Sequence, residues 1–281
     1  MSVGLLEKRH CFGGVETAIR CTDAALLAQL CAPYEEHPSD GRVPDLVVEY
    51  VVDPTVDEEP FRSDRERLMP TLDAEGVARF RGPAERHCFD VSLRLALLRA
   101  FPRQRGLILH GAAALGRGGA LLFIGPSGAG KSTIFRLLGE SGRFRERIAD
   151  ELLFVKQEWQ EEQEEQEEQE EQDGQERAAG HEPGGWRIFA TPFGGERHAA
   201  PQASAPVRAI YILRQAPRHR VLPLSRPAAL AAILPQARVY TGTREAADDL
   251  LARATRLVAD LPCFTLEFAK DPGVVAVLEE P

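Results

Sequence analysis

The sequence predicts an α/β protein, in which an α+β lead domain precedes a core built on a mixed sheet and a phosphate-binding loop. Three observations predict this fold class. A glycine-rich loop stands between a short apolar run and a segment with helical spacing. A second apolar run precedes this unit after only a tight glycine turn. Strand-like and helix-like segments are interspersed along the rest of the chain.

The predicted lead domain covers residues 1–103, which carry no recognisable chemical motif. We expect a helix over Ala24–Cys31 and strands over 45–52 and 77–81, the second strand following a turn. The segment 89–101 has helical periodicity and ends before Pro102, where a helix normally stops.

The second predicted domain covers residues 104–281 and opens with two strands. The first strand, over 106–114, passes through His110-Gly111, and the second covers residues 120–124. The glycines of 116–119 leave room only for a tight turn between them. A strand-turn-strand entry differs from a βαβ unit and therefore predicts a mixed sheet.

Residues 125–132, Gly-Pro-Ser-Gly-Ala-Gly-Lys-Ser, match the P-loop pattern G-x-x-x-x-G-K-[ST] at every fixed position. Glycines let the backbone curl so that its N–H groups point at phosphate oxygens, and Lys131 adds a positive charge. The Ser132 hydroxyl suits Mg²⁺, and the helix expected over 133–141 directs its N-terminus at the same anion. Contacts to the nucleotide are expected from Gly125, Ser127, Gly128, Ala129, Gly130, Lys131, Ser132 and Thr133. A chance glycine-rich turn is the alternative.

Two adjacent carboxylates, Asp150 and Glu151, follow at a predicted strand end. Beside a P-loop, one acid can hold Mg²⁺ and the other can accept a proton from an attacking hydroxyl. A solvated acidic turn is the competing interpretation.

The remaining segments supply elements and weaker candidates. Strands are expected over 207–213 and Cys263–Phe268, and amphipathic helices over 222–234 and 244–261. Glu196, after a Gly-Gly turn, is either a second ligand or a surface acid. One of four arginines could clamp phosphate, but the sequence does not select among Arg208, Arg214, Arg218 and Arg220.

The net charge of −9 is dominated by one low-complexity segment, 157–177. Its ten Glu, one Asp and one Arg carry −10, which leaves +1 on the rest of the chain, so the charge gives no reason to expect a nucleic-acid partner. Like charges and few apolar residues predict a surface-loop insertion rather than packed structure. An acidic lure for a basic partner is the alternative.

Composition excludes other classes. With 43% hydrophobic residues the chain can bury a core, yet no apolar run is long enough to span a membrane. The N-terminal residues lack the apolar region of a signal peptide, and the five cysteines are scattered without a CxxC pair. We therefore expect a cytoplasmic protein with reduced thiols and without a membrane partner.

At His110-Gly111, residues 125–132 and Ile148-Ala149-Asp150-Glu151, the chain resembles the HPr kinase/phosphorylase family, and more specifically its divergent HPr-kinase-related branch. The resemblance covers about residues 104–281 and implies a core related to that of phosphoenolpyruvate carboxykinase. It implies ATP at the P-loop, His110 at the phosphoryl-transfer site and Asp150 as the base for a serine hydroxyl. Multimers are also implied, so a homo-oligomer is possible.

The chain departs from this family in two places. Glu151 replaces the usual second Asp, and Trp186 to Glu196 stands where an E-L-R-G-like signature is expected. The loss of that signature puts phosphorylase activity and HPr as a substrate in doubt, whereas the extra methylene of Glu151 shifts its carboxylate and puts the metal geometry in doubt. The expected function is that of an ATP- and Mg²⁺-dependent kinase, with Asp150, His110 and Lys131 as catalytic residues and Ser132, Glu151 and Asp150 as metal ligands. The expected acceptor is a serine of a small protein or peptide. The alternatives are a small-molecule hydroxyl kinase and a non-catalytic ATP-binding regulatory module.

Overall fold

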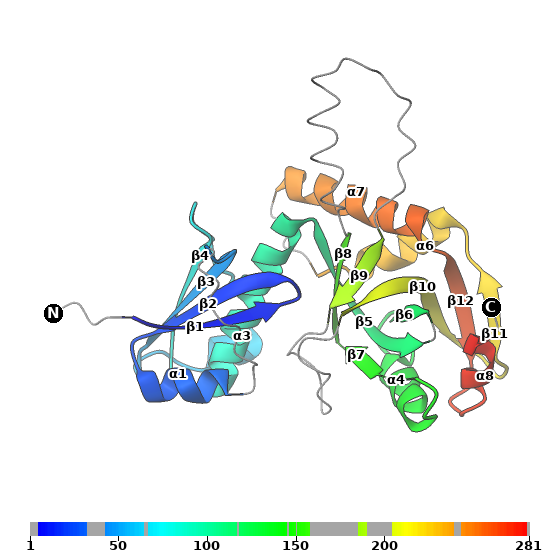
Figure 1. Ribbon diagram of the computed structural model, residues 1–281, viewed down its shortest axis with the longest axis horizontal. Helices are drawn as coiled ribbons and strands as arrows, with labels where there is room; N and C mark the ends of the chain where they lie inside the picture. Colours follow the sequence, from blue (N-terminus) through cyan, green and yellow to red (C-terminus); the bar gives the residue numbers. More distant parts are fainter. Residues whose placement is uncertain are drawn as a thin grey trace, which may run out of the picture.

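In the computed structural model, the chain folds into two sheets with helices packed against them (Figure 1). The smaller sheet has the strand order β1-β2-β3-β4, and the larger one has the order β11-β12-β10-β6-β5-β8-β9, with β7 paired to β5. Helices and mixed sheets together confirm the predicted α/β class. The structure describes residues 5–32, 43–64, 67–116, 118–144, 146–149, 151–157, 185–189, 204–238 and 243–279.

The smaller sheet opens with a hairpin that the sequence interpretation missed. β1 (Leu6–Phe12) and β2 (Val15–Cys21) pair antiparallel around Gly13 and Gly14, whose φ angles are 64° and 78°. Two consecutive positive φ angles define the turn that closes two-residue hairpins, and Gly-Gly is one of its usual sequences. The dipeptide was therefore a usable signal for these two strands.

The other elements of the lead part confirm the expectations. α1 (Ala24–Cys31) begins at Asp23, whose side chain accepts the Leu26 N–H at 2.9 Å. β3 (Leu46–Val52) and β4 (Val77–Gly82) extend the sheet as parallel strands, with the short helix α2 (Glu59–Ser63) between them in sequence.

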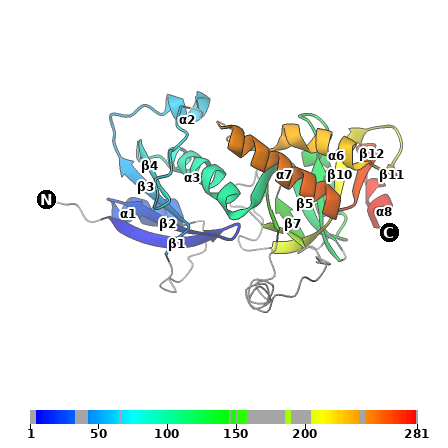
Figure 2. The same cartoon turned by 90° about the horizontal axis from the view of Figure 1, so that it is seen from above.

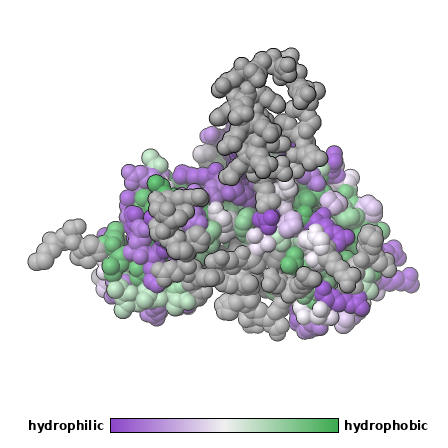
Figure 3. All heavy atoms as spheres, in the orientation of Figure 1, coloured by the Kyte–Doolittle hydropathy of each residue, from purple (hydrophilic) through white to green (hydrophobic). Residues whose placement is uncertain are grey.

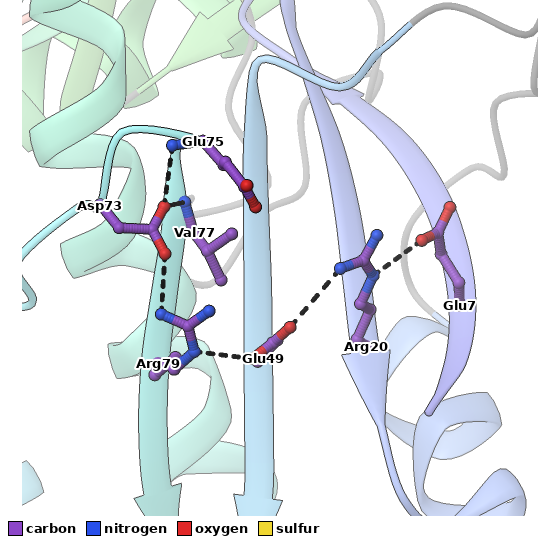
Figure 4. Close-up of polar contacts among 7 residues, drawn as sticks. All are labelled: Glu7, Arg20, Glu49, Asp73, Glu75, Val77 and Arg79. Carbon is purple, nitrogen blue, oxygen red and sulfur yellow. Dashed lines mark hydrogen bonds and ion pairs between the residues drawn. The ribbon is translucent and has the colours of Figure 1, made fainter. Parts of the chain in front are cut away.

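The outer face of this sheet is covered by a ladder of ion pairs (Figure 4). Arg20 bridges Glu7 and Glu49 at 2.8 and 3.5 Å, and Arg79 bridges Glu49 and Asp73 at 3.0 and 2.8 Å. Ion pairs near the surface each add at most about 1 kcal/mol, so the ladder adds little stability, but it links side chains of all four neighbouring strands.

α3 (Arg86–Ala100) lies between the two sheets in both ribbon views (Figures 1 and 2). It continues into a 3₁₀ turn, η1 (Phe101–Gln104), that leads to β5 (Gly106–Gly116). The core of the lead part does not stop at the expected boundary after residue 103, because Ile108, Leu152 and Phe154 of the larger sheet belong to it. The two parts therefore share apolar packing.

The larger sheet is mixed, as predicted. β6 (Gly119–Ile124) is antiparallel to β5 but parallel to β10 (Ser204–Gln215), which is in turn parallel to β12 (Cys263–Phe268). The carboxyl ends of β6, β10 and β12 therefore lie at one edge. Ligands of α/β sheets characteristically bind along such an edge.

Two short strands lie before and after the two acids, which the sequence predicts at a strand end. β7 (Glu146–Ala149) and β8 (Leu152–Gln157) both pair with β5, but in different registers. β9 (Trp186–Phe189), another strand the sequence interpretation missed, pairs with both β8 and β10. The pairings β10-β6-β5-β8-β9-β10 close a ring, which was not predicted because no strand was expected at residues 186–189.

Helices cover both faces of the larger sheet. α4 (Lys131–Glu140) and α8 (Val274–Glu279) pack on one face, and α6 (Arg226–Ile233) and α7 (Arg244–Asp260) pack on the other. Figure 2 shows α6 and α7 crossing this face side by side. The helix expected over 222–234 is partly wrong: its start is β11 (Arg220–Pro223), because these residues pair with β12, and a 3₁₀ turn, η2 (Leu234–Gln236), ends it.

The described surface is chemically mixed. Figure 3 shows hydrophilic and apolar residues interspersed over the face in view. Among the described residues, none of the helices is both long enough and apolar enough to cross a bilayer.

Candidate functional site

The loop between β6 and α4 has the backbone conformation that the P-loop pattern requires. Gly128 and Gly130 have φ angles of +80° and +104°, which side-chain-bearing residues rarely adopt. A Cβ atom on Gly130 would lie 2.6 Å from the Phe268 ring at the end of β12. Only glycine therefore fits at position 130, both for its backbone angle and for its space.

Lys131 is a buried cation at the start of α4, with 8% of its surface exposed. Its Nζ donates to the carbonyl oxygens of Gly125 and Pro126 at 2.8 and 2.9 Å. Burial, and next the charge of Arg238, lowers the Lys131 pKa. None of the ion pairs among the described residues includes Lys131, so its charge is balanced there only by carbonyl dipoles. A buried cation of this kind fits an anionic ligand.

The remaining loop residues have the geometry that an anion cradle requires. The N–H of Ala129 donates to Pro126 O at 3.1 Å, which closes the loop, and α4 begins where the Ile134 N–H donates to Gly130 O at 2.8 Å. Ser127 and Ser132 are exposed and Thr133 is half-buried. The first N–H groups of a helix have no partner within it, so the N-terminus of α4 adds donors at the same point.

His110 lies in β5 with its ring against Glu151, the residue directly before β8. Its Nδ1 is 3.1 Å from the Glu151 carbonyl oxygen. A carbonyl only accepts hydrogen bonds, so Nδ1 carries the proton and Nε2 of the neutral ring carries the lone pair. Burial lowers the His110 pKa, and the charges of Lys131 and Arg238 lower it further. The imidazole is therefore neutral near pH 7 and able to accept a proton.

Glu151 is held from two sides. Its carbonyl oxygen also accepts the Gly111 N–H at 3.2 Å, and its carboxylate lies 3.3 and 3.4 Å from Nη1 of Arg94 on α3. This carboxylate is a metal ligand in the prediction from sequence, whereas in the structure it pairs with Arg94, a cation from the lead part. Metal binding by Glu151 would require this partly exposed ion pair to open.

Arg238 is the site residue that sequence reasoning missed. It follows η2, and its N–H donates to Ile108 O at 2.7 Å while Ala237 bridges to Leu109. This pairing places the Arg238 backbone beside Ile108 of β5, which precedes His110 by two residues. The Arg238 charge lowers the pKa of both His110 and Lys131. No sequence pattern marks this arginine, because the approach depends on how the end of α6 meets β5.

Two of the candidate arginines interact with other side chains, and three further candidates lie outside the described residues. Arg214 is within 3.8 Å of Glu267, and the charge of Arg208 acts on Tyr211. Asp150, Glu196 and all of the acidic insertion except Gln157 lie outside the described residues.

A magnesium site is compatible with what the structure describes. The described residues contain no group of three His, Cys, Asp or Glu side chains that could hold a metal. Mg²⁺ beside nucleotides usually takes one or two protein oxygens, together with phosphate and water. The exposed hydroxyl of Ser132 is such an oxygen.

The ends of two further strands adjoin the loop. The Gln215 side chain, at the end of β10, donates to Gly128 O, and Phe268 lies against Gly130. The P-loop is therefore continuous with the carboxyl ends of β10 and β12. No protein-family model matches this chain, and no curated protein matches it either.

Proposed function

We propose that the protein is an ATP-dependent kinase that transfers the γ-phosphate to a hydroxyl group. The observation that carries this proposal is a neutral His110 close enough to the buried Lys131 for the lysine charge to lower the histidine pKa. A site that only binds a nucleotide needs the lysine but no proton acceptor near it. Phosphoryl transfer to an alcohol needs both a cation and a proton acceptor.

The proposed step balances with the residues available. The acceptor oxygen forms a bond to the γ-phosphorus, the bond from that phosphorus to the β-γ bridging oxygen breaks, and ADP leaves. The hydroxyl proton goes to Asp150, as the resemblance implies, or to Nε2 of His110. Lys131 and Arg238 would stabilise the negative charge on the transferred group, and Ser132 would hold a Mg²⁺ ion, which would supply further positive charge for the phosphates.

The acceptor in this proposal is a serine of a small protein or peptide. The support is the resemblance at His110-Gly111, residues 125–132 and residues 148–151, since P-loop chemistry alone does not name the acceptor. A small-molecule hydroxyl remains the alternative acceptor. We further propose a cytoplasmic location, because Cys21, Cys88 and Cys263 are buried thiols that form no disulfide.

One observation favours a second candidate function, an ATP-binding module without catalysis. The Glu151 carboxylate is paired with Arg94 instead of facing the P-loop unpaired. In such a module, occupancy of the loop would act as a signal without phosphoryl transfer.

Single-turnover transfer from γ-labelled ATP to serine-containing peptides separates the two functions. The kinase proposal expects transfer by the wild type and a fall of about 10²–10⁴ when the base is removed. A comparison of Asp150→Asn with His110→Ala identifies that base. The variant that lacks it should lose phosphoryl transfer while its ATP affinity changes little. Tight ATP binding without transfer to any hydroxyl acceptor would replace the kinase with the regulatory module.

A further inference from the structure

The carboxyl ends of β10 and β12 continue the edge on which the P-loop lies. β6, β10 and β12 run parallel, Gln215 is bonded to Gly128, and Phe268 limits the space at Gly130. The Ala216 N–H donates to Phe268 O at 3.0 Å, so the two loops that follow these strands start side by side. A nucleotide held by its phosphates in the P-loop can extend along this edge, as ligands of parallel sheets do.

A fixed carboxylate stands on the loop after β12. Asp271 Oδ1 accepts the Gly273 N–H at 2.9 Å and lies 2.9 Å from Nε2 of His219, which is on the loop after β10. The side chain of His219 is 17% exposed, whereas that of Asp271 is 55% exposed. Both hydrogen bonds use Oδ1, so the carboxylate is oriented by two loops while its second oxygen has no hydrogen bond within the described part of the chain.

We propose that Asp271, positioned by His219, binds the ribose hydroxyls of the nucleoside triphosphate. An ionised carboxylate accepts two hydrogen bonds from a vicinal diol, and acidic residues bind ribose in this way in dinucleotide sites at the ends of parallel strands. The inference rests on the proposed function, because it assumes that the phosphates occupy the P-loop. It adds the chemical class of the ligand's other half, which the P-loop pattern does not specify.

Calorimetric titration with three ligands tests this site without an activity assay. The ligands are ATP, 2′,3′-dideoxy-ATP and inorganic tripolyphosphate, each with Mg²⁺. Wild type should bind ATP about tenfold or more tightly than dideoxy-ATP, the size expected for hydrogen bonds to a charged group. Asp271→Asn should weaken ATP to the level of dideoxy-ATP and should leave dideoxy-ATP and tripolyphosphate unchanged.

Asp248→Asn is the matched control. Asp248 is an exposed acid on α7, on the opposite face of the sheet, and it lies 3.6 Å from Arg244. The substitution Asp248→Asn removes the same charge as Asp271→Asn and should change none of the three ligand affinities. The control therefore separates a contact with ribose from a general effect of charge.

Each result has a definite meaning. Equal binding of ATP and dideoxy-ATP by wild type would overturn the ribose site, and this comparison does not depend on any variant folding. Equal weakening of ATP and tripolyphosphate by Asp271→Asn would also overturn it, because the residue would then act on the phosphates. In both cases, binding of tripolyphosphate would still support phosphate binding by the P-loop. A wild type that binds neither ATP nor tripolyphosphate would overturn the proposed function together with this inference.

Discussion

Two cations, Lys131 and Arg238, act electrostatically on His110. Together with burial, their charges lower the pKa of His110 and so favour its neutral form, and the Arg238 charge also lowers the pKa of Lys131. Concentrated positive charge near a neutral base is what a transferred phosphoryl group and a deprotonating hydroxyl require.

Lys131→Ala should abolish most of the stabilisation that ATP and Mg²⁺ give to the folded protein. Ligand that binds only the folded state raises Tm by mass action, and the variant lacks the charge that faces the phosphates. The measurement is the ligand-induced shift in Tm, which separates binding from any direct effect on stability. Lys156→Ala removes the same charge from β8, where the side chain lies 3.4 Å from Gln104, and should leave the shift intact. Equal shifts in wild type and Lys131→Ala would contradict the P-loop assignment.

Arg238→Gln should raise the His110 pKa, because a nearby cation disfavours the imidazolium form. Nuclear magnetic resonance titration of the histidine rings measures this, with His110→Ala to assign the signal. Arg208→Gln is the control, since that charge acts on Tyr211. No movement of the His110 signal in Arg238→Gln would remove Arg238 from the site.

The same shift fixes the direction of pH dependence. Because burial and two cations lower the pKa of His110 in the folded protein below its ordinary value of 6.5, protonation favours the unfolded chain. This contribution to stability is therefore lost as pH falls below about 6.5. If His110 is the base, transfer should fall over the same acidic range, and in Arg238→Gln the fall should begin at higher pH.

At the scale of elements, β8 and β9 show how the acidic insertion is accommodated. Gln157 and Trp186, the residues that border the intervening segment, are paired directly in the antiparallel ladder. Their backbones are therefore already at the separation that a hairpin loop spans. Loop length costs little closure free energy, so a long segment can be inserted between two paired strand ends.

Replacing residues 158–184 with a short Gly/Ser loop should leave folding and the ATP-induced Tm shift unchanged and should raise the isoelectric point. The physical reason is that the ladder between β8 and β9 needs only its two ends held together. Circular dichroism and thermal shift with ATP test this prediction. Loss of the ATP shift in a folded variant would show that the segment takes part in the site.

At the scale of the whole molecule, the hairpin of β1 and β2 is packed against the P-loop sheet. Gly13 has a φ of +64°, and a Cβ at this position would lie 2.6 Å from the Phe154 ring in β8. Phe154 is 1% exposed and lies against Phe101, with ring centroids 4.6 Å apart. The ring cannot retreat into solvent, so this close approach connects the two sheets.

Gly13→Ala should therefore reduce the free energy of unfolding by about 2–4 kcal/mol, combining backbone strain with a clash at a packed ring. Gly118→Ala is the matched control, because its φ is +78° but a Cβ there meets nothing within 4 Å. The control should lose only about 1–2 kcal/mol from backbone strain. Urea unfolding curves measure both, and equal losses would show that the hairpin does not press on β8.

The sequence by itself determined the elements whose signals are local. The P-loop pattern, the apolar runs of β6 and β12, and the periodicity of α1, α3 and α7 all depend on residues a few positions apart. The mixed sheet also followed from sequence, because a glycine turn too short for a crossover forces β5 and β6 to be antiparallel.

The tertiary structure alone decided which distant residues meet. Arg238 reaches His110 because Ala237 bridges to β5, and Arg94 reaches Glu151 because α3 lies between the two sheets. Likewise, β9 is a four-residue strand that exists through its pairing with β8 and β10, and β11 replaces the start of a predicted helix because β12 offers it partners. Such contacts depend on how whole elements pack. The local sequence of an element does not indicate which distant element will become its neighbour.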